Sequence, residues 1–204
     1  MRSIISDSIE ALAFDLDGTL YDEYDFVRQA YRAISQKMSL ETDMDEKKIY
    51  EDLCRFWLEH GSSANVFQMA YDQQSDQPMP DQLLKSCVEE FRNADFELIL
   101  SQRVSDFLDM VKDYPKVIIT DGNSELQRKK YRSLGLDRWF KDDCIFVSGD
   151  FDKKHYKPDP YMGDLAKQEL HTDKILYFGD REIDRKFAEN AGFDFVMVKN
   201  MTIV

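Results

Sequence analysis

Five short apolar runs, separated by longer polar segments, constrain the fold of this chain most strongly. The runs lie at 9–17, 117–120, 145–148, 175–178 and 195–198. Each is of strand length, and near-continuous apolar character is typical of strands buried on both faces of a sheet. The first run ends in acidic residues and a glycine, which indicates a strand followed by a tight loop. The pattern predicts a mainly parallel sheet.

Helical segments separate the later strands. The segment 124–134 begins with Ser124 and carries Gln127 three residues later, which predicts a capping box, and Gly135 follows as the stop. Two further helices are predicted at 159–170, which has Pro160 near its start, and at 181–191. Strands that alternate with helices predict an α/β fold with a doubly wound, mainly parallel, Rossmann-like sheet.

The region from about 22 to 97 interrupts this alternation. It contains no convincing strand, and apolar residues such as Val27, Tyr31 and Ile34 recur at helical spacing. Three or four amphipathic helices are therefore expected there. The predicted organisation is a discontinuous α/β core over 1–20 and 98–204, with a helical insertion over 21–97.

The balance of charge excludes some classes of partner. Among the 204 residues, 40 are acidic and 27 are basic, so the net charge is −13. Nucleic acids and anionic membranes are bound by basic surfaces, so neither is expected as a partner. A small anionic substrate remains compatible with this charge, because a bound divalent cation can reverse the local field.

The cysteines and the apolar segments bear on the cellular compartment. Cys54, Cys87 and Cys144 are odd in number and lack metal-ligand spacing, so we expect free thiols in a reducing environment. Asp7 and Glu10 interrupt any apolar run near the start, which argues against a signal peptide. No stretch approaches the ~20 apolar residues of a membrane span. The sequence therefore predicts a cytoplasmic protein.

Two carboxylates follow the first predicted strand. Asp15 and Asp17 are two residues apart, so both point to one side of an extended chain. Gly18 allows a sharp turn, and we expect the hydroxyl of Thr19 to hold that turn by a hydrogen bond. Two acids this close repel each other unless a cation or a proton lies between them. In parallel sheets, ligands bind beyond the carboxyl ends of the strands, where this pair lies.

Four motifs in this order resemble those of the haloacid dehalogenase-like hydrolases, the HAD superfamily. They are Asp-Leu-Asp-Gly-Thr at 15–19, Thr-Asp-Gly at 120–122, Lys-Pro-Asp-Pro at 157–160 and Gly-Asp-Arg-Glu-Ile-Asp at 179–184. The resemblance covers the α/β portion. The helical insertion is similar to the family's cap only in its position and helical character.

The resemblance implies a role for each acidic residue. Asp15 is expected to attack phosphorus and form an aspartyl-phosphate, and Asp17 to act as general acid and then general base. The cofactor implied is Mg²⁺, which prefers oxygen ligands. Its ligands would be the Asp15 carboxylate, the Asp17 backbone carbonyl and Asp180, and Asp184 would orient metal-bound water.

The other two motifs imply a phosphate-binding site. Thr120 is expected to donate its hydroxyl to the phosphoryl group, with the backbone N–H groups of Asp121 and Gly122 as further donors. The family often has asparagine in place of Asp121, and a second acid beside phosphate is unfavourable unless its side chain points away. Lys157 is expected to neutralise the phosphoryl group and the carboxylates.

Some assignments near these motifs remain open. Lys153 and Lys154 are interpreted as solvent-exposed, although either could replace Lys157 because the preceding stretch is longer than in many relatives. Arg181 and Glu182 are interpreted as a surface ion pair at a helix start. The alternative is that Glu182 holds metal-bound water.

The function implied is hydrolysis of a small phosphomonoester through an aspartyl-phosphate. Alternatives are a phosphomutase of the same family, similar to beta-phosphoglucomutase, and a catalytically silent binding module. A carboxylate at Asp17 suits protonation of an alkoxide, so dehalogenation is disfavoured. By resemblance the insertion closes over the site and selects a small phosphorylated metabolite. Tyr21, near its hinge, is a candidate substrate contact but is interpreted first as a surface residue.

Overall fold

The computed structural model of the chain describes residues 5–62 and 65–203. Residues 1–4 of the predicted core and residues 63–64 of the predicted insertion lie outside this description. Within the described part of the chain, no helix has both the length and the apolar character needed to cross a bilayer.

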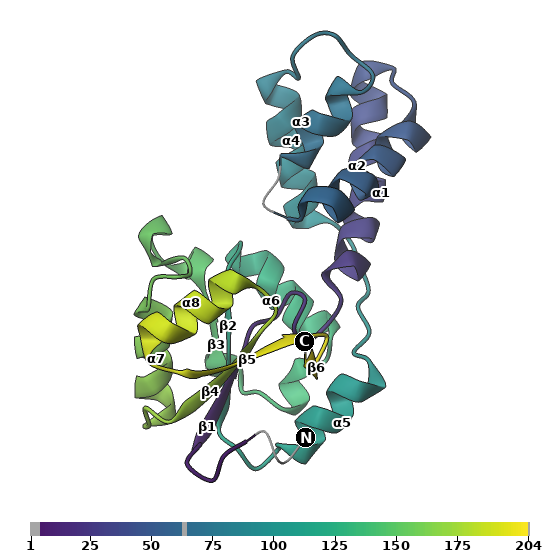
Figure 1. Ribbon diagram of the computed structural model, residues 1–204. Helices are drawn as coiled ribbons and strands as arrows, with labels where there is room; N and C mark the ends of the chain where they lie inside the picture. Colours follow the sequence, from purple (N-terminus) through teal and green to yellow (C-terminus); the bar gives the residue numbers. More distant parts are fainter. Residues whose placement is uncertain (1–4, 63–64, 204) are drawn as a thin grey trace. The chain divides into compact units, whose positions relative to one another are not determined.

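The chain forms two compact units, which Figure 1 shows in the colours of the sequence. The core unit consists of the chain up to Glu23 together with the chain from Leu98 onward. The helical unit consists of Tyr24–Glu97. Because the second unit interrupts the first, the core is built from two separate stretches of sequence.

A sheet with the strand order β3-β2-β1-β4-β5-β6 forms the centre of the core unit. Its strands are β1 (Ala11–Phe14), β2 (Lys116–Thr120), β3 (Ile145–Val147), β4 (Ile175–Gly179), β5 (Asp194–Lys199) and β6 (Thr202–Ile203). The first five strands pair in parallel, whereas β6 pairs with β5 in the antiparallel direction. The α/β fold with a mainly parallel sheet is confirmed, while the short strand β6 was not predicted.

Helices cover both faces of this sheet. They are α5 (Gln102–Met110), α6 (Ser124–Ser133), α7 (Tyr161–Leu170) and α8 (Glu182–Ala191). On one face, Ala11 and Tyr177 of the strands belong to a buried cluster with Met162 of α7 and Phe187 of α8. On the other face, the rings of Phe14 and Phe178 stack on each other, and Phe107 of α5 meets both edge-on. Alternate strand residues therefore point to opposite helical layers.

The start of α6 differs from the prediction. Asn123 is the N-cap, and its side chain accepts a hydrogen bond from the backbone N–H of Leu126 at 3.0 Å. The predicted capping box of Ser124 and Gln127 is wrong, because the Gln127 side chain turns instead into the polar site described below. Gly135 has a φ of 62° and ends the helical segment as predicted.

The described residues of the helical unit form four helices. They are α1 (Glu23–Thr42, which starts at the last residue of the core unit), α2 (Glu46–His60), α3 (Val66–Asp72) and α4 (Asp81–Asn93). The predicted stripe on α1 is buried, with Val27, Tyr31 and Ile34 at most 2% exposed. The ring of Phe26 packs edge-on against Phe91 at a centroid distance of 5.0 Å. The unit thus has an apolar interior of its own.

Candidate active site

The core unit gathers polar residues beyond the carboxyl ends of its parallel strands. Asp15 follows β1, Thr120 ends β2 and Asp180 follows β4. The backbone N–H of Asp15 donates to the carbonyl of Phe178 at 2.8 Å, which ties the end of β1 to the end of β4. Because parallel strands end at the same edge, residues distant in sequence meet there.

Lys157 lies between two carboxylates in the interior. Its Nζ is 2.6 Å from Asp15 Oδ1 and 2.7 Å from Asp184 Oδ1, and all three side chains are at most 1% exposed. The hydroxyl of Tyr177 also donates to Asp184 Oδ1, at 3.3 Å. Burial opposes the charge of Lys157, yet the two carboxylates raise its pKa well above the usual value. The structure therefore holds a cation directly beside Asp15.

Lys153 and Lys154 lie outside this cluster. Both are exposed, and Lys154 Nζ lies 3.8 Å from the exposed carboxylate of Asp152. The longer stretch before Lys157 forms a short 3₁₀ turn at Lys153–His155, which leaves Lys157 as the lysine that enters the site.

A group of carboxylates next to Lys157 suits a divalent cation. Oxygens of Asp15, Asp180 and Asp184 lie within 4.8 Å of one another. Asp15 Oδ2 and Asp180 Oδ1 are buried and accept no hydrogen bond within the described residues. Burial, with the neighbouring carboxylates, raises the pKa of Asp15 well above its usual value, and burial raises that of Asp180 to about 6. Mg²⁺ prefers carboxylate oxygens as ligands, and buried oxygens without a hydrogen bond are available to it, so these residues fit that ion.

Asp184 differs from the other two acids because both of its oxygens are already engaged. Oδ1 accepts from Lys157, and Oδ2 accepts from the backbone N–H of Arg181 at 3.1 Å. These bonds, together with the charge of Lys157, keep its pKa below the usual value although burial opposes this. Asp184 is thus suited to orient other groups in the site.

The turn after Asp15 depends on glycine. Gly18 has a φ of 77°, and a Cβ there would lie 2.3 Å from Asp180 Oδ2. The prediction that the Thr19 hydroxyl holds this turn is wrong, because Thr19 Oγ1 is buried without a hydrogen-bond partner among the described residues. The backbone holds the turn instead. The N–H groups of Asn200 and Met201 donate to the carbonyls of Gly18 and Thr19 at 2.8 and 3.1 Å.

Asp17 is surrounded by donors that the sequence did not reveal. Its Oδ1 accepts from the Tyr21 hydroxyl and from Lys130 Nζ, the latter at 2.7 Å, and its Oδ2 accepts from Gln127 Nε2 at 2.7 Å. Burial opposes the charge of Asp17, but Lys130 and these hydrogen bonds lower its pKa. Tyr21 is only 4% exposed, so its interpretation as a surface residue is wrong.

The second motif meets the site through Thr120. Thr120 Oγ1 accepts from Gln127 Nε2 at 2.7 Å. The Asp121 carboxylate accepts from the backbone N–H of Lys157 at 3.3 Å, which orients this extra acid toward a loop. The N–H of Gly122 donates to the buried hydroxyl of Ser148 at 3.1 Å. Since this amide is already used, the structure does not present Gly122 as the phosphate donor that was expected.

Arg181 and Glu182 do not form the expected ion pair. Glu182 is exposed and pairs with Arg185, whose Nε lies 2.9 Å away. Helical spacing places those two on one face, whereas Arg181 is the extended N-cap of α8. Arg181 Nε instead approaches Asp180 Oδ1 at 3.8 Å.

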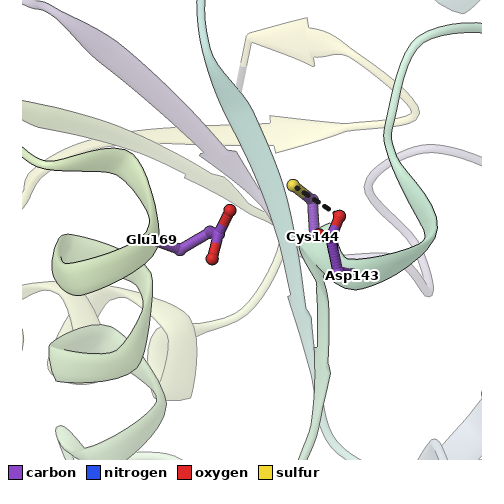
Figure 2. Close-up of side chains that lie close together, drawn as sticks. All are labelled: Asp143, Cys144 and Glu169. Carbon is purple, nitrogen blue, oxygen red and sulfur yellow. Dashed lines mark hydrogen bonds between the residues drawn. The ribbon is translucent and has the colours of Figure 1, made fainter.

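A second group of potential metal ligands lies near β3. Figure 2 shows Glu169 of α7 directed toward Asp143 and Cys144, whose sulfur is 3.7 Å from Asp143 Oδ1. Burial raises the pKa of the Cys144 thiol, although the thiolate is the form that binds metals. Burial also lowers the pKa of Lys116, which interacts electrostatically with Cys144. The acidic group around Asp15 is therefore the better candidate for a cation.

Comparisons with known proteins agree with this geometry. The family model described as "Haloacid dehalogenase-like hydrolase" matches residues 12–198. A glyceraldehyde 3-phosphate phosphatase from Methanopyrus kandleri is 24% identical over 211 residues, covering 94% of this chain and 84% of that protein. Because the family model spans most of the chain, the protein belongs to the haloacid dehalogenase-like hydrolases and is an enzyme of that class.

Solved structures of this family share the fold. A protein from Thermotoga maritima described as a beta-phosphoglucomutase has a TM-score of 0.68 and 24% identity, with 93% of this chain and 85% of that chain covered. The HAD-hydrolase YfnB from Bacillus subtilis, solved bound to magnesium, has a TM-score of 0.63 and 21% identity, with coverages of 93% and 86%.

Proposed function

We propose that the protein is a Mg²⁺-dependent phosphatase that hydrolyses a small phosphomonoester through an aspartyl-phosphate on Asp15. The observation that carries this proposal is the buried Asp15 carboxylate. One of its oxygens bonds Lys157, and the other accepts no hydrogen bond within the described residues. Oxygens of Asp15 and Asp180 lie within 4.8 Å of each other. A carboxylate that is buried from water, next to a fixed cation and to residues that could hold a divalent cation, is suited to attack a phosphoryl group.

Asp15 acts as the nucleophile and Asp17 as the general acid and base. In the first step an Asp15 oxygen bonds to phosphorus while the P–O ester bond breaks, and the protonated form of Asp17 gives its proton to the leaving alkoxide. In the second step Asp17 takes a proton from water, whose oxygen attacks phosphorus and releases phosphate from Asp15. Asp17 is suited to both steps because it follows Asp15 by two residues at the same strand end.

The cation and the phosphoryl group have separate binding residues. Asp15, Asp180 and the Asp17 backbone carbonyl would hold Mg²⁺, with Asp184 orienting its water. When bound, the ion would neutralise charge on the phosphoryl oxygens and the carboxylates. Thr120 Oγ1 accepts a hydrogen bond from Gln127, which leaves the hydroxyl hydrogen available for phosphate. Lys157 contributes a buried positive charge to the same group.

The helical insertion, residues 21–97, is proposed to act as a cap that selects small substrates. The insertion leaves the core at Glu23, a few residues after Asp17, and returns at Leu98. The relative from Methanopyrus kandleri is named for a small phosphorylated metabolite, which supports this substrate class. A cap that closes over the site and excludes water admits small metabolites more readily than phosphoproteins.

Turnover of 4-nitrophenyl phosphate with Mg²⁺ tests the proposal. The wild type should release phosphate, and Asp15→Asn should lose essentially all turnover. Asp152→Asn removes an exposed carboxylate and serves as the matched control, with activity expected to stay unchanged. Full activity of Asp15→Asn would overturn the assignment of the nucleophile.

A panel of phosphorylated metabolites then identifies the substrate. Free phosphate as the product is expected for a phosphatase, whereas an isomerised sugar phosphate with little free phosphate would indicate a mutase. If the wild type turns over none of them, neither releasing phosphate nor isomerising the sugar phosphate, the result favours the catalytically silent binding module.

A further inference from the structure

Helix α6 sends two buried polar side chains toward Asp17. Gln127 and Lys130 are three residues apart, so they lie on one helix face. They are 2% and 3% exposed, and each places a nitrogen 2.7 Å from a different oxygen of the Asp17 carboxylate. Together with the Tyr21 hydroxyl, they give this carboxylate three donors.

Burial of Gln127 and Lys130 requires that their polar groups be paired. A lysine ammonium or a glutamine amide removed from water destabilises the fold unless it is paired. The lack of a side chain at Gly122 leaves space for Gln127, since a Cβ at Gly122 would lie 3.2 Å from the Gln127 side chain. These side chains are therefore fixed to Asp17 by the packing of α6 and are not mobile surface groups.

Gln127 also contacts a second residue of the site. The same Nε2 that donates to Asp17 Oδ2 lies 2.7 Å from Thr120 Oγ1. One amide therefore spans the proposed acid/base and the proposed phosphate-binding hydroxyl. A shift of Gln127 would alter the position of both at once.

We propose that Gln127 and Lys130 are positioning residues that hold the Asp17 carboxylate for proton transfer and couple its orientation to the phosphate-binding Thr120. This inference rests on the proposed function. A leaving group of high basicity needs a well-placed proton donor, whereas a weakly basic one departs without that help. Loss of the positioning residues should therefore impair turnover of some substrates far more than others.

The test compares kcat/KM for 4-nitrophenyl phosphate and phenyl phosphate, whose leaving groups differ in basicity. In the wild type both should be hydrolysed. Lys130→Met should lower kcat/KM for phenyl phosphate more than that for 4-nitrophenyl phosphate, by a further factor on the order of 10 or more. Gln127→Leu should change the ratio of the two kcat/KM values in the same direction. Because this variant keeps the Lys130–Asp17 pair, it provides the test if Lys130→Met fails to fold.

Two further variants separate positioning from a structural role. Lys130→Arg keeps the positive charge and should recover much of the wild-type ratio. Arg132→Met removes an exposed charge from the same helix and should leave the ratio unchanged. Equal losses for both substrates in Lys130→Met and Gln127→Leu, or wild-type ratios in both, would overturn the inference. A wild type inactive on both substrates would overturn the proposed function itself.

Discussion

Lys157 shows how strongly individual polar residues of the core depend on their partners. Its ammonium group lies between Asp15 and Asp184, and none of the three has appreciable contact with water. A buried charge that keeps its partner adds little to stability, whereas a buried charge that loses its partner destabilises the fold severely. Buried residues of this kind affect folding and chemistry together.

Lys157→Met should therefore lose both activity and stability. The substitution leaves two buried carboxylates without their shared cation, and we expect the free energy of unfolding in the absence of metal to fall by about 3–5 kcal/mol. Urea denaturation measures this quantity. Lys154→Met, at an exposed position, is the matched control and should stay within about 0.5 kcal/mol of the wild type. A Lys157→Met protein as stable as the wild type would contradict the buried contacts of Lys157 with Asp15 and Asp184.

Substitution of Thr19 should raise stability, in contrast to substitution of Lys157. Its hydroxyl is buried and makes no hydrogen bond within the described residues, so Thr19→Val removes an unsatisfied polar group while keeping a branched side chain. We expect stability to rise by about 1 kcal/mol. Thr120→Val provides the contrast, because it breaks the bond to Gln127 and should destabilise. A loss of stability in Thr19→Val would show that its hydroxyl has a partner.

At the scale of elements, local sequence patterns predicted most of the fold. The five apolar runs correspond to β1–β5. β1, β2 and β4 are buried along their whole length, which leaves a continuous apolar signal. The strand β6 is only two residues long and antiparallel, so it carries no such signal. Helix ends were harder to predict, because Asn123 and Ser124 are both good caps and only tertiary contacts of Gln127 decide between them.

The same reasoning explains what was predicted of the site. Asp15, Thr120, Lys157 and Asp180 follow strands or short motifs, and the structure brings them to one edge of the sheet. Gln127 and Lys130 were missed because polar residues on a helix usually face solvent. Their burial follows only from packing α6 against the turn at Asp17, which no local pattern encodes.

The contact between α7 and α8 gives a prediction at this scale. A Cβ at Gly163 would lie 2.6 Å from the Ala191 side chain, so Gly163→Ala forces the helices apart. Overpacking of this kind should cost about 1–3 kcal/mol, observable as a lower urea midpoint. The double variant Gly163→Ala with Ala191→Gly moves the methyl group to the other helix and should recover part of the loss. Equal stability of wild type and Gly163→Ala would contradict the close contact.

For the whole molecule, the buried oxygens of Asp15 and Asp180 that accept no hydrogen bond within the described residues predict a strong effect of metal on stability. Mg²⁺ at about a hundredfold excess over its dissociation constant should stabilise the native state by roughly 2.7 kcal/mol. For a chain of this size that raises the melting temperature by roughly 5–10 °C, which differential scanning calorimetry with and without a chelator measures. Asp180→Asn should largely abolish the increase, and Asp152→Asn should retain it. An unchanged melting temperature in the wild type would count against a cation at Asp15 and Asp180.

The bonds from Asn200 and Met201 to the turn at Gly18 and Thr19 have a consequence for protein synthesis. The turn at Gly18 and Thr19 is synthesised well before Asn200 and Met201, whose amides hold it. At roughly 5–20 residues per second, the segment from Thr19 to Asn200 takes roughly 10–40 seconds to translate. During that interval the nascent chain carries its acidic loop without the backbone partners that shape it. We therefore expect catalytic competence to arise only after residues 200 and 201 have emerged, however early the helical unit folds.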